Sequence, residues 1–336
     1  MREPDGSSGH GACVRKARAL MAPRVTYNVI RRRSQLSASK KLAPSENERE
    51  EVKQWLLGQG YPLEMSVARS FQETGYHVTQ SEYYLDSDTG KAREIDLVAR
   101  LEFPVEGEGK GICVTLVVEC KVAPKPWVVF SSGQQVYPLS LFDALVSPAG
   151  EILLSNQEEF GDLSTRGIIC GPNCVAYGAT VALRAKNDEQ DQAYRACTTV
   201  AKAAMSYHGK EPLWGHSNVT EWATLTLPVI IIDGSMFTAR LDESGDLEVE
   251  AVDRSRLVLK NPELGNSAPA IIDVVTRRYL PQFAQSLKEE IQGIVKLCEE
   301  NPDLLSERAI PAARWFSQML SRCEEEDMPG GEGGKE

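Results

Sequence analysis

Residues 112–122 read Ile-Cys-Val-Thr-Leu-Val-Val-Glu-Cys-Lys-Val, an apolar run that ends in two charged side chains, Glu119 and Lys121. A short run that is rich in β-branched residues predicts a buried strand. Burying an unpaired charge is costly, so the two charges at the end of this strand need a physical reason. A bound divalent cation would supply that reason.

The segments before this strand predict a compact supersecondary unit. Residues 62–75 carry apolar side chains at helical spacing and include Glu64. Residues 76–85 and 92–103 predict two strands, and Asp96 lies in the second of them. The sequence therefore predicts a helix followed by a three-stranded meander, which is the opening half of a small α/β core.

The segments after the strand predict the rest of the domain. Prolines break residues 123–186, which we interpret as a packed insertion. An amphipathic helix is predicted over residues 188–208, and a buried strand over 227–232. Two further strands are predicted, over residues 237–241 and 247–259. A last amphipathic helix carries Phe283, Leu287, Ile291, Ile294, Val295 and Cys298.

The two ends of the chain differ in composition from the middle. Residues 1–44 are rich in Gly, Ser and Arg and predict a flexible basic arm, with ten Lys or Arg against two acidic residues. An alternative is that translation starts at Met21. We expect a C-terminal helix over residues 301–323 and a disordered acidic tail over 324–336.

The overall composition indicates a globular protein. The chain has 336 residues, of which 42% are hydrophobic and 25% charged, with a formal net charge of −11. No apolar run approaches the roughly 20 residues of a membrane-spanning helix, and the N-terminus lacks the apolar core of a secretory signal. We therefore expect a cytoplasmic protein that has no membrane partner. The basic arm could supply phosphate contacts that the acidic remainder cannot.

Strand geometry brings the charged residues together in this prediction. Side chains alternate between the two faces of a strand, so Glu119 and Lys121 point the same way, as do Glu94 and Asp96. If the two strands pair, Asp96 and Glu119 can converge on one cation. Hard ions such as Mg²⁺ prefer oxygen ligands of this kind.

The order of these residues resembles the PD-(D/E)xK nuclease superfamily, which has the restriction-endonuclease-like fold. The resemblance rests on Glu64 in the helix, Asp96 in the second strand, and Glu119-Cys120-Lys121 in the third. It implies an α/β domain over residues 45–300, with a restriction-endonuclease-like core in which helices flank a mixed central sheet, plus the insertion and extra C-terminal helices. It also implies a nuclease that requires Mg²⁺ or Mn²⁺ and hydrolyses phosphodiester bonds, in DNA, in restriction, defence or repair.

The resemblance assigns roles to individual residues. Asp96, Glu119, Lys121 and Glu64 become the catalytic residues, and Asp96, Glu119 and Cys120 the metal-ligating ones. A weaker signal is the pair Gln190 and Tyr194, which fits the Gln-x-x-x-Tyr pattern of exonuclease-like branches and would contact substrate from one helix face.

A second interpretation stays open at this point. The same fold could serve as a pseudo-nuclease that binds nucleic acid or a protein partner without cleavage. An intact set of Asp96, Glu119 and Lys121 favours the nuclease, whereas the acidic body favours the binding protein. We expect nucleic acid, above all DNA, as the partner, and a homodimer or a partner protein could add to it.

Overall fold

The computed structural model describes the greater part of residues 45–305. The described residues are 45–86, 88–107, 109–136, 145–156, 160, 167–169, 173–183, 192–208, 210, 218–259 and 270–305. The basic arm, most of the expected C-terminal helix and the acidic tail lie outside them. The chain divides into two units, Met1–Glu46 and Asn47–Glu336, and the second contains every strand that the structure describes.

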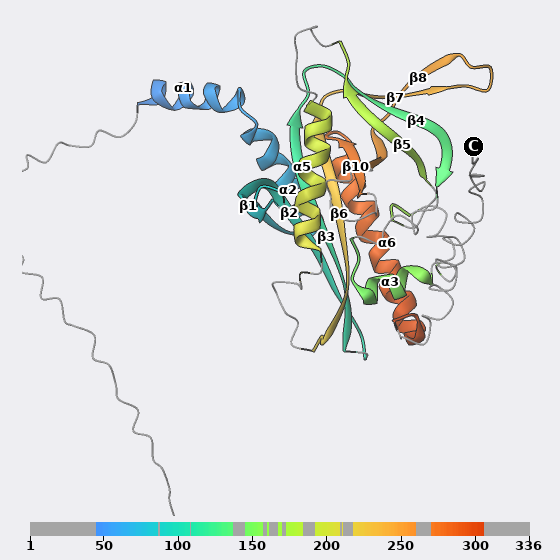
Figure 1. Ribbon diagram of the computed structural model, residues 1–336. Helices are drawn as coiled ribbons and strands as arrows, with labels where there is room; N and C mark the ends of the chain where they lie inside the picture. Colours follow the sequence, from blue (N-terminus) through green and yellow to red (C-terminus); the bar gives the residue numbers. More distant parts are fainter. Residues whose placement is uncertain are drawn as a thin grey trace, which may run out of the picture. The chain divides into compact units, whose positions relative to one another are not determined.

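The second unit is an α/β structure (Figure 1). The α-helices among the described residues are α1 (Glu46–Leu57), α2 (Tyr61–Thr74), α3 (Pro148–Ser155), α5 (Gln192–Tyr207) and α6 (Leu280–Glu300), and a 3-10 turn, η4 (Pro302–Leu305), follows them. The strands described are β1 (His77–Leu85), β2 (Ala92–Val105), β3 (Lys110–Val122), β4 (Trp127–Val136), β5 (Asn173–Val181), β6 (Glu221–Asp233), β7 (Met236–Leu241), β8 (Leu247–Ala251), β9 (Arg254–Leu259) and β10 (Ala270–Thr276).

These ten strands form a single mixed sheet in the order β1-β2-β3-β6-β10-β9-β5-β4-β7-β8. The helices α2, α3 and α6 pack against one face, where they share an apolar core with alternate residues of β2, β3 and β6. Helix α5 packs on the other face, and the small buried residues along it, such as Ala196 and Ala204, let it lie close to the sheet (Figure 1). The sheet therefore has two separate apolar cores.

The structure confirms the predicted helix and meander. Helix α2 and strands β1, β2 and β3 follow one another along the chain, and β2 pairs antiparallel with both of its neighbours. The strand predicted over residues 227–232 is the apolar end of β6, which runs parallel to β3 from Lys110 to Val122. Helix α5 precedes β6, as predicted, although residues 188–191 lie outside the described part of the chain.

The middle and the end of the chain differ from their predictions. Residues 123–186 do not simply interrupt the sheet, because β4 and β5 extend it on the far side of β9. Residues 237–259 form three strands rather than two. Strand β10 was not predicted at all, and it occupies a central place between β6 and β9. Of the helix expected over residues 301–323, the described residues form only the short turn η4.

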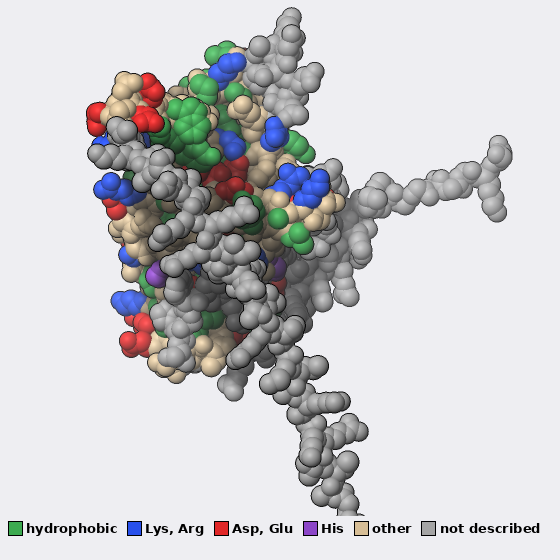
Figure 2. Space-filling model, turned by 90° about the vertical axis from the view of Figure 1, so that its left-hand side faces the viewer, with side chains coloured by type: hydrophobic (Ala, Val, Ile, Leu, Met, Phe, Trp, Pro, Cys, Tyr) green, Lys and Arg blue, Asp and Glu red, His purple; other side chains and the backbone are tan. Residues whose placement is uncertain are grey.

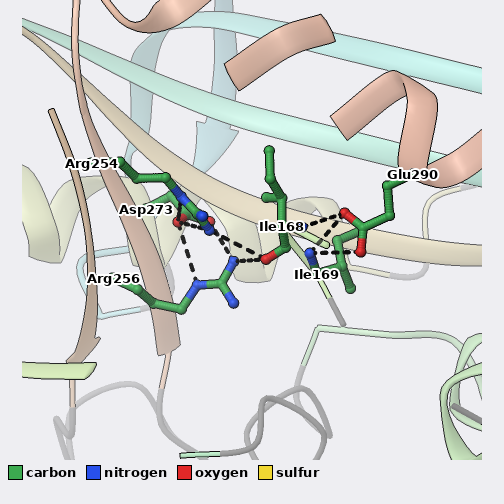
Figure 3. Close-up of polar contacts among 6 residues, drawn as sticks. All are labelled: Ile168, Ile169, Arg254, Arg256, Asp273 and Glu290. Carbon is green, nitrogen blue, oxygen red and sulfur yellow. Dashed lines mark hydrogen bonds and ion pairs between the residues drawn. The ribbon is translucent and has the colours of Figure 1, made fainter. Parts of the chain in front are cut away.

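A buried charged network explains how an acidic residue can lie within the central strand β10. Asp273 pairs across the strands with Arg256 of β9, and both residues are 2% exposed. The Arg256 Nη2 donates to Asp273 Oδ2 at 2.9 Å, and the Arg254 Nε donates to Asp273 Oδ1 at 2.9 Å (Figure 3). Burial alone would raise the pKa of Asp273, but the two guanidinium groups hold it below its usual value.

The same network holds a segment that lies outside the regular elements. Arg256 also donates to the carbonyl oxygen of Ile168. On the other side, the buried carboxylate of Glu290, from α6, accepts the backbone N–H groups of Ile168 at 2.6 Å and Ile169 at 3.0 Å (Figure 3). One short piece of backbone is thus bound through its donors and its acceptor, and it joins β9 to α6.

Candidate functional site

Strands β2 and β3 separate at one end, and the charged residues lie at this fork. The two strands pair from Val105 and Lys110 as far as Leu97 and Val118. Beyond that point β2 continues to pair with β1, while β3 continues to pair with β6 up to Val122. Past Leu97 and Val118, the backbone groups of β2 and β3 that face the fork therefore no longer pair with each other in a ladder.

Asp96 closes the fork with its side chain. Its Oδ2 accepts the backbone N–H of Cys120 at 2.6 Å, in the place that a backbone carbonyl would take in a regular ladder. The carbonyl of a strand residue faces the same neighbour as its N–H, so the Cys120 carbonyl also faces the fork. The carboxylate of Asp96 is thereby fixed at the Cys120 backbone, and its charge acts on both Glu119 and Lys121.

Glu119 and Lys121 are next to each other on one face of β3, as predicted. The Lys121 Nζ donates to Glu119 Oε1. Glu119 is 7% exposed, whereas a third of the Lys121 side chain reaches solvent. Burial lowers the pKa of Lys121, but the nearby carboxylates, Glu119 first, raise it above its ordinary value, so the lysine is charged.

The C-terminal end of β3 is fixed by its contacts with the end of β6. The Ala123 N–H donates to the Asp233 carbonyl at 3.1 Å. Gly234 follows at such close range that a Cβ there would lie 2.3 Å from the Ala123 carbonyl oxygen. Residues 119–122 therefore have a fixed path even though β2 has left them.

Glu64 reaches the site from helix α2. It lies in the first turn of the helix, and its Oε1 lies 3.4 Å from where a Cβ would stand on Gly60, so the absence of a side chain there leaves room for the carboxylate. Burial raises the pKa of Glu64, and so do the negative charges of Asp96 and Glu94, while Lys121 lowers it. Glu64 therefore belongs electrostatically to the same group.

Negative charge exceeds positive charge in this site. Burial raises the pKa of Glu119 to about 7; Lys121 opposes this shift, and Asp96 and Glu64 add to it. Burial also raises the pKa of Asp96, although the Cys120 N–H opposes it. Three carboxyl groups with raised pKa values face one lysine, and an added cation would lower all three.

The donor atoms suit a hard divalent ion. Within the described ranges, no three or more His, Cys, Asp or Glu side chains are grouped so as to hold a metal ion. Mg²⁺, however, is commonly bound through one or two carboxylates together with waters and substrate phosphates. Asp96 and Glu119 are the two carboxylates that would supply such oxygens.

Cys120 can contribute only in part to such a site. Burial raises the pKa of its thiol well above the ordinary value, and the carboxylates of Asp96, Glu64 and Glu119 add to the effect. A protonated thiol is a poor ligand for a hard ion. The backbone carbonyl of Cys120, which faces the fork, is the group that fits the predicted ligand role.

Of the two remaining predicted residues, Gln190 and Tyr194, the structure describes only Tyr194. Gln190 lies outside the described residues, and the described part of helix α5 runs from Gln192 to Tyr207. Tyr194 is in the first turn of α5 and is 53% exposed. Sequence reasoning assigned no role to Glu94, whose charge acts on both Asp96 and Glu64. The feature of the sequence that could have indicated such a role is the position of Glu94, two residues before Asp96.

The chain is an α/β protein with a ten-stranded mixed sheet and a carboxylate-rich site at a strand fork. No family model, curated protein or solved structure matches it. In the part of the chain that the structure describes, no helix is long and apolar enough to cross a membrane.

The raised pKa of Glu119 predicts a specific dependence of stability on pH. The folded protein holds the Glu119 proton more tightly than the unfolded chain, whose carboxyl titrates near 4.5. This contribution to the free energy of unfolding amounts to roughly 3 kcal/mol at most. It is fully present below about pH 4.5 and is lost as the pH rises through about 7. Glu119→Gln cannot titrate at this position, so its urea midpoint should rise relative to wild type across that window. Parallel profiles for the two metal-free proteins would contradict the expectation.

Proposed function

We propose that this protein is a divalent-metal-dependent nuclease that hydrolyses phosphodiester bonds in DNA. The observation that carries the proposal is the fork between β2 and β3, where the Asp96 carboxylate binds the Cys120 N–H beside the ion pair of Glu119 and Lys121. The order of α2, β1, β2, β3, α5 and β6, with β6 parallel to β3, supports a restriction-endonuclease-like core around it.

Each residue of the site has a role in this proposal. Bound Mg²⁺ or Mn²⁺ would polarise the scissile phosphate and lower the pKa of a bound water. Asp96 and Glu119 supply carboxylate oxygens for the ion, and Cys120 its carbonyl. Lys121 is charged and partly exposed, so it can orient the attacking water or offset the negative charge that develops on the phosphate. Glu64 can hold a further water.

Binding of nucleic acid needs positive charge from somewhere in the chain. On the face drawn in Figure 2, a small group of acidic side chains lies among separate basic and apolar ones, and the visible part has no continuous basic surface. The basic residues before Ser45 are the main concentration of positive charge in the sequence, and a bound metal ion would add more.

One observation favours a second function, that of a non-catalytic binding protein. The Lys121 Nζ binds Glu119 directly, so the carboxylate already has a cationic partner without a metal ion. If this ion pair only stabilises the fold, the site has no catalytic role, and the protein would bind nucleic acid or protein without cleaving it.

A metal titration followed by a cleavage assay distinguishes the two functions. For a nuclease, calorimetry should detect Mg²⁺ or Mn²⁺ binding, and a hundredfold excess over Kd should stabilise the native state by about 2.7 kcal/mol. Labelled duplex DNA, single-stranded DNA and RNA should then be incubated with and without the ion. Asp96→Asn should remove both metal binding and cleavage, because the amide keeps an acceptor for the Cys120 N–H but loses the charge. Wild-type protein that binds DNA but neither binds metal nor cleaves would support the second function.

A further inference from the structure

Strand β1 contains a backbone irregularity opposite Asp96. It pairs with β2 on both sides of this point, at Gln80 with Leu97 and at Glu82 with Ile95, but Ser81 and Asp96 are left out of the register. Ser81 has a φ of 54°, in the left-handed region that residues with a Cβ rarely adopt. Among the described residues other than glycine, only Leu183 shares this feature, with a φ of 56°.

The side of the sheet toward which the side chains of β2 point also changes at this position. Leu97 packs in the core on the side of α2 and α6, whereas Ile95 packs on the side of α5 together with Tyr84. In a regular strand, residues two apart share a face. The strand therefore turns over between Ile95 and Leu97, at Asp96.

The turn in β2 coincides with the point where its ladder with β3 ends. The last pair of that ladder is Leu97 with Val118, and the next bond across the fork is made by the Asp96 side chain to the Cys120 N–H. A residue held in a sparsely populated backbone conformation stores strain, and such residues cluster at active sites and ligand clamps.

We propose that Ser81 is a positioning residue: its left-handed backbone sets the local twist of β1 and β2 that directs the Asp96 carboxylate across the fork to Cys120. Its importance for catalysis rests on the proposed function, but the geometry of Asp96 does not. The strain at Ser81 persists because the flanking pairs on both sides fix the strand around it. Ser81 itself is exposed, so a substitution there tests the backbone and not core packing.

The test compares substitutions that permit or oppose the left-handed conformation. Glycine adopts a positive φ without a steric penalty, while a β-branched side chain disfavours it. The readout is hydrogen exchange at the Cys120 amide, measured by NMR on the full-length, metal-free protein. Ser81→Gly should keep wild-type protection, and Ser81→Val should lower protection at Cys120 at least tenfold. Ser81→Thr, with the same type of branch, gives a second measurement if Ser81→Val does not fold.

Leu183 provides the matched control, because it has the same left-handed backbone and is exposed, but lies after β5. Leu183→Val should leave the Cys120 amide as protected as in wild type. Wild-type protection in Ser81→Val would overturn the proposal, and so would equal losses in Ser81→Val and Leu183→Val. The exchange measurement requires neither metal nor substrate. If the wild-type protein fails to cleave DNA, the proposed function is wrong, and the exchange data still decide whether Ser81 positions Asp96.

Discussion

Asp273→Asn should lower the free energy of unfolding by about 3 kcal/mol, at the low end of the roughly 3–5 kcal/mol expected when one partner of a buried ion pair is removed. The asparagine has nearly the same shape, so it leaves no cavity and can still accept one hydrogen bond. It removes the carboxylate that is paired with Arg256, which is 2% exposed, and with Arg254. Urea unfolding followed by circular dichroism measures the change.

Asp233→Asn is the matched control for this effect. Asp233 lies at the end of the neighbouring strand β6 and pairs with Arg277 at 2.9 Å, but nearly half of each side chain is exposed. Exposed pairs of this type contribute about 0–1 kcal/mol. If the two substitutions lowered the urea midpoint by the same small amount, the buried network of Asp273 would not have the stabilising role that its burial implies.

The same network shows why one central strand could not be predicted. Residues 270–276 contain an aspartate in the middle of an apolar run, and an unpaired charge argues against a buried strand. Its partners, Arg254 and Arg256, are separated from it in sequence and meet it only through the pairing of β9 with β10. The meander of β1, β2 and β3 was predictable because its apolar pattern and turns are local. Strands β4 and β5 were missed because prolines surround them and their partners are distant.

The candidate site was predictable in its residues but not in its geometry. Strand alternation was sufficient to place Glu119 and Lys121 together, and the resemblance supplied Asp96 and Glu64. No local pattern indicates that β2 turns over at Asp96, or that its carboxylate takes the place of a ladder carbonyl at Cys120. These features depend on how three strands diverge, so they became apparent only in the folded protein.

Lys121→Ala should reduce metal-dependent cleavage of DNA by about 10²–10³-fold, the usual effect of removing a group that stabilises charge developing in the transition state. Metal binding should survive, because the lysine is not a ligand and its loss leaves more negative charge at the fork. Asp96→Asn should instead lose metal binding and cleavage together. Calorimetry with Mn²⁺ and a cleavage time course on the same preparations separate the two effects.

Lys121→Ala should also affect stability in a pH-dependent way, which distinguishes a lysine at this site from one that is merely solvated. Without Lys121, the buried carboxylate of Glu119 has no cation beside it, so its pKa should rise further above the wild-type value of about 7. The metal-free variant should therefore be less stable than wild type above pH 7 and close to it below about pH 5. Lys110→Ala, at the opposite end of β3, should leave cleavage unchanged. Equal cleavage by wild type, Lys110→Ala and Lys121→Ala would show that Lys121 has no catalytic role, and the binding protein would then be the better account of this fold.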